Sequence, residues 1–181
     1  MKMNFCNVCG HSLEQRIPPD DDRERHVCGQ CDTVHYLNPR IIAGALVTAG
    51  EAILLCRRAI EPRRGLWTLP AGFMENGETT TEAAIRETRE EALAEVTGSR
   101  LYTIFNLPEI DQVYMFYLAG LKGDGFAAGT ESLEVRLFRE DEIPWDHLAF
   151  PVVRRTLQLF LEDRQRDHFP VRVEDMRWRR P

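Results

Sequence analysis

The sequence predicts an α+β fold: a mixed β-sheet packed between helices, preceded by a small cysteine-held segment. Three observations predict it. Short apolar runs bounded by Gly and Pro are typical of strands. Two stretches, near residues 79–96 and 150–164, have apolar residues at helical spacing. Four of the five cysteines lie in two Cys-x₂-Cys pairs within residues 1–37. The strands precede and follow the first helix in runs, which favours a mixed sheet over regular βαβ alternation.

Length and composition bound the function. With 181 residues and 29% charged side chains, the chain is expected to form one globular domain with a small appendage. Its net charge of −6 argues against a protein that wraps nucleic acid. No apolar run approaches the roughly 20 residues of a membrane span. The start, "MKMNFCNVCG", lacks the apolar core of a secretory signal, so we expect a cytoplasmic protein without membrane partners, with an organellar protein whose transit peptide is absent from this sequence as the alternative.

The spacing of the N-terminal cysteines predicts a metal site. In a reducing compartment, paired cysteines indicate metal rather than disulfides. Two disulfides or a chance pattern are the alternatives. His26 and His35 are interpreted as ordinary polar residues, because four thiolates already fill a tetrahedral Zn²⁺ shell. The segment between the pairs, "IPPDDDRERHV", has few core-forming residues, so metal binding would supply its folding energy. The expected zinc ligands are Cys6, Cys9, Cys28 and Cys31.

The remaining elements follow in order. Residues 38–40, "NPR", are expected to be a linker between a ribbon (1–37) and a main domain (38–165), with a C-terminal tail at 166–181. Cys56 lies in an apolar run and is most simply a buried thiol. Strands are predicted at 41–50 and 51–59 as a hairpin, then at 65–73, 100–107, 112–121 and 134–140, with a Gly-rich loop at 122–132 and a C-terminal helix at 150–164.

The middle helix concentrates negative charge. Thr79 and Glu82 form a capping box at its start. A packing side is expected from Ala83, Ala84, Thr88, Ala92 and Val96. Glu87, Glu90 and Glu91 stand at i, i+3 and i+4 and therefore share another face, at a cost of roughly 0.2–0.5 kcal/mol per like-charged pair. A solvated face with an Arg86–Glu90 pair is the simplest explanation of such a helix.

Two features favour a metal site instead. The Gly-rich loop "LPAGFMENGE" directly precedes the helix, so its backbone carbonyls are available to a cation. The spacing Gly72-x₅-Glu78-x₇-Arg86-Glu87-x₂-Glu90-Glu91 is also specific. Mg²⁺ and Mn²⁺ prefer oxygen ligands. A bound cation removes the repulsion between the carboxylates and can hold diphosphate oxygens.

The segment from Gly72 to Glu91 resembles the Nudix box. The resemblance implies that Glu87, Glu90 and Glu91 ligate divalent metals near the Gly72 carbonyl. It also implies that Arg86 orients the glutamates and that Glu78 braces the corner between loop and helix. One position departs from the pattern, because Leu93 stands where the family usually has glycine.

The likeness extends over nearly the whole chain. The cysteine pairs followed by "NPR", "LLCRRAIEPRRGLWTLPAGF" and "ESLEVRLFREDEIPWDHLAF" resemble the zinc-ribbon Nudix hydrolases, and among them the plant plastid FAD and ADP-ribose pyrophosphatases. The resemblance implies a Nudix α/β/α sandwich. It also implies Mg²⁺- or Mn²⁺-dependent cleavage of FAD to AMP and FMN, or of ADP-ribose to AMP and ribose 5-phosphate.

Further site residues are candidates only. Glu91 and Glu131 are both candidates for the general base, whereas Glu134 is interpreted as structural. Several side chains are candidates for substrate contact: the aromatic rings of Trp67, Phe73 and Tyr114 for ring stacking, Arg58 among its neighbouring arginines for a phosphate, and Phe150, on resemblance alone, for a lid.

Other functions stay open. They are hydrolysis of NADH, of an oxidised nucleoside triphosphate or of an RNA cap, and a regulator that senses a nucleotide while its ribbon binds nucleic acid. The complete set of glutamates counts against the regulator, and the acidic charge makes nucleic acid an unexpected partner. Family members are commonly homodimers, so the resemblance implies a homodimer here.

Overall fold

The computed structural model describes residues 3–177. Its contacts divide the chain into two compact units, Met1–Asn38 and Pro39–Pro181, which we describe separately. The division falls inside the predicted linker at residues 38–40. The last residue of that linker, Arg40, already belongs to the first strand of the larger unit.

The N-terminal unit is a small antiparallel sheet of order β1-β2-β3. Its strands are β1 (Leu13–Arg16), β2 (Arg25–Cys28) and β3 (Val34–His35). None of the three clusters of buried apolar side chains found in the described residues includes a residue of this unit. Phe5, Val8 and Tyr36 are instead more than 60% exposed. This unit therefore has no hydrophobic core among its described residues.

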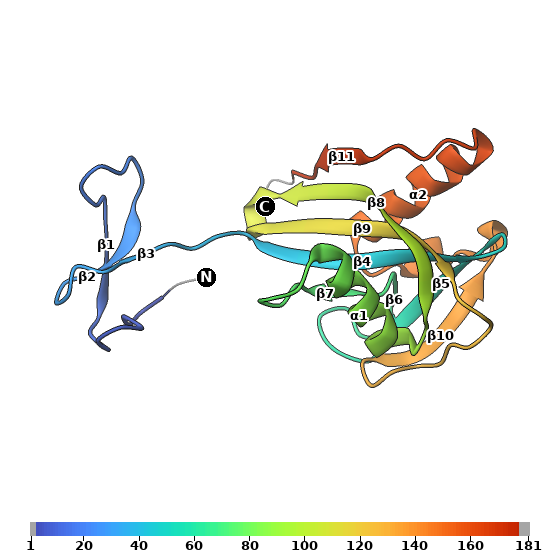
Figure 1. The fold of residues 1–181 in the computed structure, drawn as a ribbon, viewed down its shortest axis with the longest axis horizontal. Coiled ribbons are helices and arrows are strands. Elements are labelled where there is room, and N and C mark those ends of the chain that lie inside the picture. The colour runs from blue at the N-terminus through green and yellow to red at the C-terminus, as the bar shows by residue number, and fades with distance from the viewer. Residues whose placement is uncertain (1–2, 178–181) are drawn as a thin grey trace. The chain divides into compact units, whose positions relative to one another are not determined.

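The larger unit is built on one mixed sheet of order β10-β5-β4-β9-β8-β11, with β6 on β5 and β7 on β4 (Figure 1). β4 pairs with β9 in parallel, and so does β8 with β11; the other pairs are antiparallel. The elements are β4 (Arg40–Ala49), β5 (Ala52–Arg58), β6 (Trp67–Thr68), β7 (Ala71–Phe73), α1 (Thr80–Ala92), β8 (Val96–Leu107), β9 (Gln112–Leu121), β10 (Ser132–Phe138), α2 (Pro151–Gln165) and β11 (Arg172–Asp175), with 3₁₀ turns at Pro108–Ile110, Glu140–Glu142 and Trp145–His147.

Alternation along the strands assigns each helix to one face of the sheet. On β4, Ala43 packs with α1 residues, while Leu46 packs with α2 residues. On β5, Leu54 and Leu55 divide in the same way between the two sides. Successive side chains of a strand point to opposite faces, so α1 and α2 cover opposite faces (Figure 1). The predicted α/β/α sandwich with a mixed sheet is confirmed.

The middle helix ends earlier than its apolar pattern predicts. Val96 was expected on the packing side of the helix, but α1 ends at Ala92 and Val96 begins β8. The expectation was wrong because Leu93 adopts the left-handed conformation, with φ 47° and ψ 31°, and terminates the helix. Leu93 occupies the position where the family has glycine, the residue that adopts this conformation most easily.

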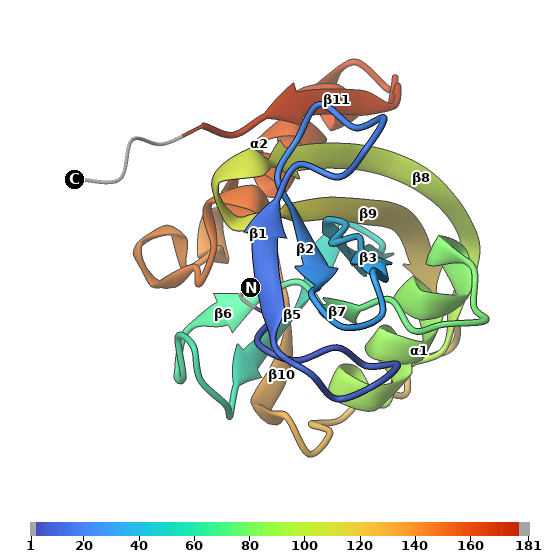
Figure 2. The ribbon, with the colours of Figure 1, turned by 90° about the vertical axis from the view of Figure 1, so that its left-hand side faces the viewer.

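The segment 166–181, expected to be a tail, contributes a strand to the sheet. Within it, β11 pairs in parallel with β8 at the sheet edge (Figure 2). Two ion pairs stabilise this strand against α2. Arg172 contacts Asp163, whose carboxylate is 1% exposed. Arg155 binds Glu174 at 2.7 Å. The pairing of β11 with β8 joins segments that are distant in sequence, so local patterns did not predict it. Among residues 3–177 no helix is long and apolar enough to cross a membrane.

Candidate active site and zinc centre

The N-terminus of α1 is fixed by the predicted capping box. The Glu82 backbone N–H donates to the Thr79 hydroxyl at 3.2 Å, and the Thr79 N–H donates to the Glu82 carboxylate at 2.7 Å. Satisfying these two backbone donors sets where the helix begins. The glutamates one and two turns later therefore have a defined direction relative to the loop before the helix.

Gly72 lets the strand before the loop approach the acidic face of α1. A Cβ built on Gly72 would lie 2.3 Å from the Glu87 carboxylate, which no side chain can tolerate. Gly72 is held in β7 by its antiparallel pairing with Ala43 of β4. Glycine at this position therefore brings a backbone strand directly against a carboxylate, as the sequence pattern predicts for a shared cation site.

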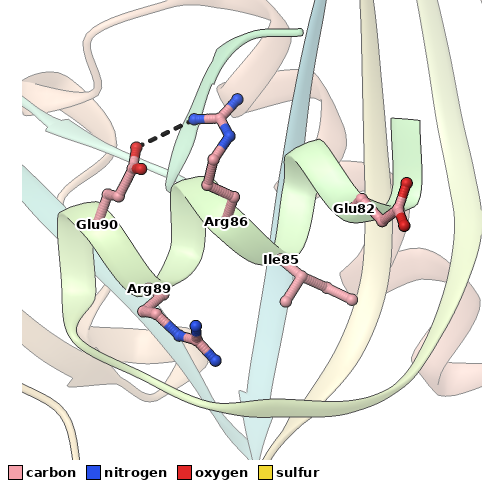
Figure 3. A pocket seen from close by; sticks show the side chains of 5 residues that line it. All are labelled: Glu82, Ile85, Arg86, Arg89 and Glu90. Atoms are coloured by element: carbon pink, nitrogen blue, oxygen red, sulfur yellow. Dashed lines mark hydrogen bonds and ion pairs between the residues drawn. The ribbon is translucent and has the colours of Figure 1, made fainter. Parts of the chain in front are cut away.

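Arg86 organises the carboxylates around the loop. Its guanidinium donates to Glu78 at 2.7 and 3.0 Å, to Glu87 at 2.7 Å and to Glu90 at 3.0 Å. It also donates to the Phe73 carbonyl at 3.1 Å. Figure 3 shows Arg86 and Glu90 directed to the same side of α1, with Arg89 directed away from them. Hydrogen bonding to Arg86 lowers the pKa of Glu78 to about 2, so Glu78 stays ionised as the brace.

Glu91 is the buried member of the acidic face. Its side chain is 5% exposed, and one carboxylate oxygen, Oε2, has no hydrogen-bond partner in the described part of the chain. Burial raises the pKa of Glu91 to about 8, and the charge of Glu87 adds to this effect. Burial also raises the pKa of Glu87. A buried oxygen without a partner is costly, so this group is set to receive a ligand.

The predicted Gly-rich loop is anchored to the end of α1. The N–H groups of Ala127 and Gly129 donate to the carbonyls of Ala92 and Glu91, at 2.8 and 3.0 Å. A Cβ on Gly129 would lie 1.7 Å from the Glu90 carbonyl oxygen. Two residues later, the charge of Glu131 adds to the raised pKa values of Glu87 and Glu91, so the loop brings Glu131 close to the acidic face.

Of the candidate substrate residues, Arg58 lies near this face. The Arg58 charge opposes the burial that raises the pKa values of Glu91 and Tyr114, and the Arg58 guanidinium lies 5.2 Å from the Phe150 ring centroid. The Phe73 ring is 48% exposed. Trp67 is half-buried and packs edge-on against Phe138 in the main core. Phe73 is thus the most accessible of the three predicted rings, and Trp67 the most integrated into the core.

The donor set of the acidic face fits a divalent cation. Glu87, Glu90 and Glu91 supply hard carboxylate oxygens, which Mg²⁺ and Mn²⁺ prefer. The partnerless oxygen of Glu91 and the raised pKa values of two of the glutamates are consistent with a site that a positive charge completes.

The four predicted zinc ligands converge in the N-terminal unit. The Sγ atoms of Cys6, Cys9, Cys28 and Cys31 all lie within 4.8 Å of one another. The Cys6–Cys31 and Cys9–Cys28 separations are 3.7 and 3.4 Å, and all four thiols are free. Tetrahedral Zn²⁺ with bonds of about 2.3 Å places its sulfurs about 3.8 Å apart. The donor set fits zinc, and no disulfide joins these four cysteines in the structure.

Neighbouring groups hydrogen-bond these sulfurs. His35 is buried, and its Nε2 lies 3.4 Å from Cys6 Sγ, which also accepts the Val8 N–H at 3.4 Å. The Thr33 hydroxyl lies 3.1 Å from Cys31 Sγ. His35 and its cross-strand neighbour His26 are both buried, and of the two it is His35 that contacts a cysteine sulfur. The sequence predicts both as ordinary polar residues outside the ligand set, and the cluster of four cysteines includes neither. Proximity to a cysteine pair in sequence was the one signal available, and it does not distinguish a contact from a neighbour.

Family comparisons agree with this geometry. Residues 4–37 match a zinc-ribbon family model described as Nudix N-terminal, and residues 38–160 match the NUDIX domain. The chain superposes on a crystal structure of a NUDIX hydrolase from Nitrosomonas europaea with a TM-score of 0.90. The identity is 47%, covering 96% of this chain and 100% of the other.

Two relatives carry functional names. One is an ADP-ribose pyrophosphatase of Methanocaldococcus jannaschii, 27% identical over 80% of this chain and 77% of its own length. Another is the NAD-capped RNA hydrolase NudC of Pseudomonas aeruginosa, 30% identical over 92% of this chain, which spans 59% of that protein's length. The predicted resemblance to zinc-ribbon Nudix hydrolases is confirmed, while the likeness to plant plastid enzymes stays a prediction.

Proposed function

The chain belongs to the Nudix hydrolase family, and we propose that it cleaves the pyrophosphate bond of ADP-ribose, giving AMP and ribose 5-phosphate. One observation carries the proposal: on the acidic face of α1, Glu87 lies against Gly72, and the buried Glu91 has a carboxylate oxygen without a partner among the described residues. The M. jannaschii relative is named for this activity. FAD, which the sequence resemblance implies, belongs to the same chemical class of substrate.

Glu87, Glu90 and Glu91, with the Gly72 carbonyl, would hold the divalent cation that Nudix enzymes require. A bound Mg²⁺ or Mn²⁺ supplies Lewis acidity at the phosphates and lowers the pKa of coordinated water. Arg86 keeps Glu87 and Glu90 oriented through its hydrogen bonds. With the cation bound, the acidic face becomes complementary to the negative charge of a diphosphate.

Glu131 is the general base in this proposal, with Glu91 as the alternative. The Glu131 side chain is exposed and lies close enough to Glu87 and Glu91 to affect their pKa values. It would accept the proton of the attacking water as the new phosphorus–oxygen bond forms. The bond to the bridging oxygen breaks, and the two products leave as phosphate monoesters.

The candidate substrate residues would hold the rest of the substrate. Arg58 would contact a phosphate oxygen. Phe73 and Tyr114 would stack on the planar ring, beside Trp67, which packs against the core.

We also propose that the chain forms a homodimer. We propose three divisions of the chain: a ribbon (1–37), a Nudix domain (38–165) and a C-terminal segment (166–181).

Removal of an NAD cap from RNA is the second candidate. It is favoured by the NudC relatives, which match most of this chain. Because the chain spans only 58–59% of those proteins, their activity does not transfer to it directly. An acidic net charge of −6 also weakens the attraction for a long RNA, so ADP-ribose remains the first candidate.

The test is release of the expected product, resolved by chromatography, with each substrate tested with Mg²⁺ or Mn²⁺. That product is AMP from ADP-ribose, FAD or NADH, the nucleoside monophosphate from an oxidised nucleoside triphosphate, and nicotinamide mononucleotide from an NAD-capped RNA. We expect ADP-ribose to be cleaved with the highest kcat/KM. The double variant Glu90→Gln, Glu91→Gln should lose activity together with metal binding. Glu131→Gln should lower kcat and leave metal affinity unchanged. Preference for another substrate would replace ADP-ribose, and an active double variant would refute the site.

A further inference from the structure

Arg40 is a cation without an anionic partner beside an acidic site. The chain carries a net charge of −6, and eleven of its described arginines lie within 4.0 Å of a carboxylate, namely Arg16, Arg23, Arg25, Arg57, Arg86, Arg89, Arg136, Arg139, Arg155, Arg164 and Arg172. Within residues 3–177, no carboxylate lies within that distance of Arg40. Its guanidinium lies instead 4.6 Å from the centroid of the Phe73 ring.

Backbone pairing in the sheet fixes the positions of both Arg40 and Phe73. The Arg40 N–H donates to the Asp111 carbonyl at 2.9 Å, and Arg40 pairs with Gln112 at the start of β4 and β9. Phe73 pairs with Ile42, which pairs on its other side with Tyr114. A row Phe73–Ile42–Tyr114 thus crosses three strands, and Arg40 precedes Ile42 by two residues on the same face of β4.

A groove opens at this position. It has a volume of about 420 Å³ and is lined by residues 39–41 and 73–77. Arg40 lines it as a cation, and Glu75 contributes one carboxylate to the same lining. The size lies in the range of small-molecule sites. A guanidinium held against a ring and lining an open groove is suited to bind a phosphate, which accepts two parallel hydrogen bonds from it.

The groove adjoins the candidate metal site through the chain itself. Phe73 follows Gly72, whose Cα lies against the Glu87 carboxylate. The Phe73 carbonyl accepts a hydrogen bond from Arg86 at 3.1 Å. A nucleotide whose diphosphate lies at the glutamates can therefore extend another group into the groove.

We propose that Arg40 extends the same site to a further class of substrate, by binding a phosphate ester that such a nucleotide carries in addition to its diphosphate. The proposal rests on the proposed function, because it places the diphosphate at the α1 glutamates. ADP-ribose and FAD have no such group. Two sources share the required chemistry: the 2′-phosphate of an NADP-type dinucleotide and the 3′-phosphate ester that joins a capping nucleotide to RNA.

Product analogues test the proposal without turnover. We would measure the Kd of AMP, adenosine 2′,5′-bisphosphate and adenosine 3′,5′-bisphosphate by calorimetry, with Mg²⁺ present, for the full chain and Arg40→Gln. In the unmodified chain one bisphosphate should bind about tenfold or more tightly than AMP, as expected for hydrogen bonds to a charged group. In Arg40→Gln that preference should disappear, while the Kd of AMP changes less than twofold.

Two further variants separate a specific contact from general charge. Arg89→Gln removes the same charge from an arginine that pairs with Glu95, and it should leave the bisphosphate preference intact. Glu75→Gln removes the carboxylate of the groove and should strengthen the preference. Tighter 2′,5′-bisphosphate binding identifies the NADP-type source, and tighter 3′,5′-bisphosphate binding identifies the RNA source.

The proposal is overturned if neither bisphosphate binds more tightly than AMP, or if the preference survives Arg40→Gln. The ADP-ribose assay separates this failure from that of the proposed function. Cleavage of ADP-ribose without any bisphosphate preference removes only the role of Arg40. Loss of AMP binding from the Glu90→Gln, Glu91→Gln variant, together with a retained preference in Arg40→Gln, would place the extra phosphate elsewhere.

Discussion

The two candidate metal centres of this chain relate to the fold in opposite ways. In the N-terminal unit, four thiols converge where the described residues form no hydrophobic core. In the larger unit, the core is formed by apolar side chains on both faces of the sheet, and the acidic face of α1 lies beside it. We therefore expect zinc to substitute for a core in the first unit, and the second unit to fold on its apolar core without its metal.

The difference teaches what each metal does to stability. In a unit of this kind, the free energy of zinc binding contributes directly to the free energy of folding. The carboxylates of α1, by contrast, repel one another and include a buried group whose pKa is raised to about 8. Without metal this face is a local cost to the fold, a property expected of sites selected for function rather than stability.

The largest expected effect is on the ribbon. Removing zinc with a chelator should unfold the N-terminal unit, because apparent binding energies of structural zinc are about 10–16 kcal/mol in zinc-finger peptides. Amide hydrogen exchange would show loss of protection in β1–β3, while β4, β9 and α2 keep theirs. Protection that persists in β2 after zinc removal would show that the N-terminal unit folds without its metal.

A pH dependence should appear in the metal-free protein through Glu91. Burial raises its pKa from 4.5 to about 8, so its contribution to stability is fully present below pH 4.5 and is lost as the pH rises to 8. The free energy of unfolding should fall by about 5 kcal/mol across that window from this group. Urea unfolding at several pH values measures it.

The exposed Glu95 provides the control for that pH dependence. The metal-free variant Glu95→Gln should keep the fall in stability, and Glu91→Gln should largely remove it. Mg²⁺ at saturating concentration should reverse the trend in the unmodified chain, because only the ionised carboxylate binds the metal. A fall of equal size in metal-free Glu91→Gln would assign the effect to other groups.

His35 should affect zinc retention. The imidazole N–H donates to a ligand thiolate in our interpretation of the 3.4 Å contact with Cys6. Partners of this kind typically change metal affinity about 10–100-fold. His35→Phe should release zinc to a chelator correspondingly faster, and His35→Gln, which keeps an N–H donor, should recover part of the loss. Zinc release from His35→Phe as slow as from the unmodified chain would show that ring packing, not the N–H donor, is what matters.

The smallest effect concerns Leu93. A left-handed conformation costs a non-glycine residue about 1–2 kcal/mol, partly offset by the flexibility of glycine when unfolded. Leu93→Gly should therefore stabilise the metal-free protein by about 0.5–1 kcal/mol, measured by thermal unfolding. Leu93→Ala keeps the strained backbone and should bring no such gain. A destabilised Leu93→Gly would mean that the half-exposed leucine side chain makes contacts of greater value.

What the sequence could predict was local. The i, i+3, i+4 spacing of Glu87, Glu90 and Glu91 depends only on the geometry of a helix turn. The spacing of the paired cysteines depends only on the tight turn that brings two thiolates to one metal. Arg40 and β11 depend on contacts between distant segments, so no local pattern indicates them. Glu131 lies between these cases: family likeness indicated its loop, and hydrogen bonds to the end of α1 bring that loop close to the site.

The central claim is that the α1 glutamates form a site for metal-dependent hydrolysis at the expense of stability. Glu91→Gln tests it most directly, by its thermal unfolding without metal and its ADP-ribose hydrolysis with Mg²⁺, both at pH 8. We predict a higher Tm than the unmodified protein and a loss of kcat/KM of at least about a hundredfold, the size typical of losing electrostatic transition-state stabilisation. A lower Tm together with retained hydrolysis would contradict the account.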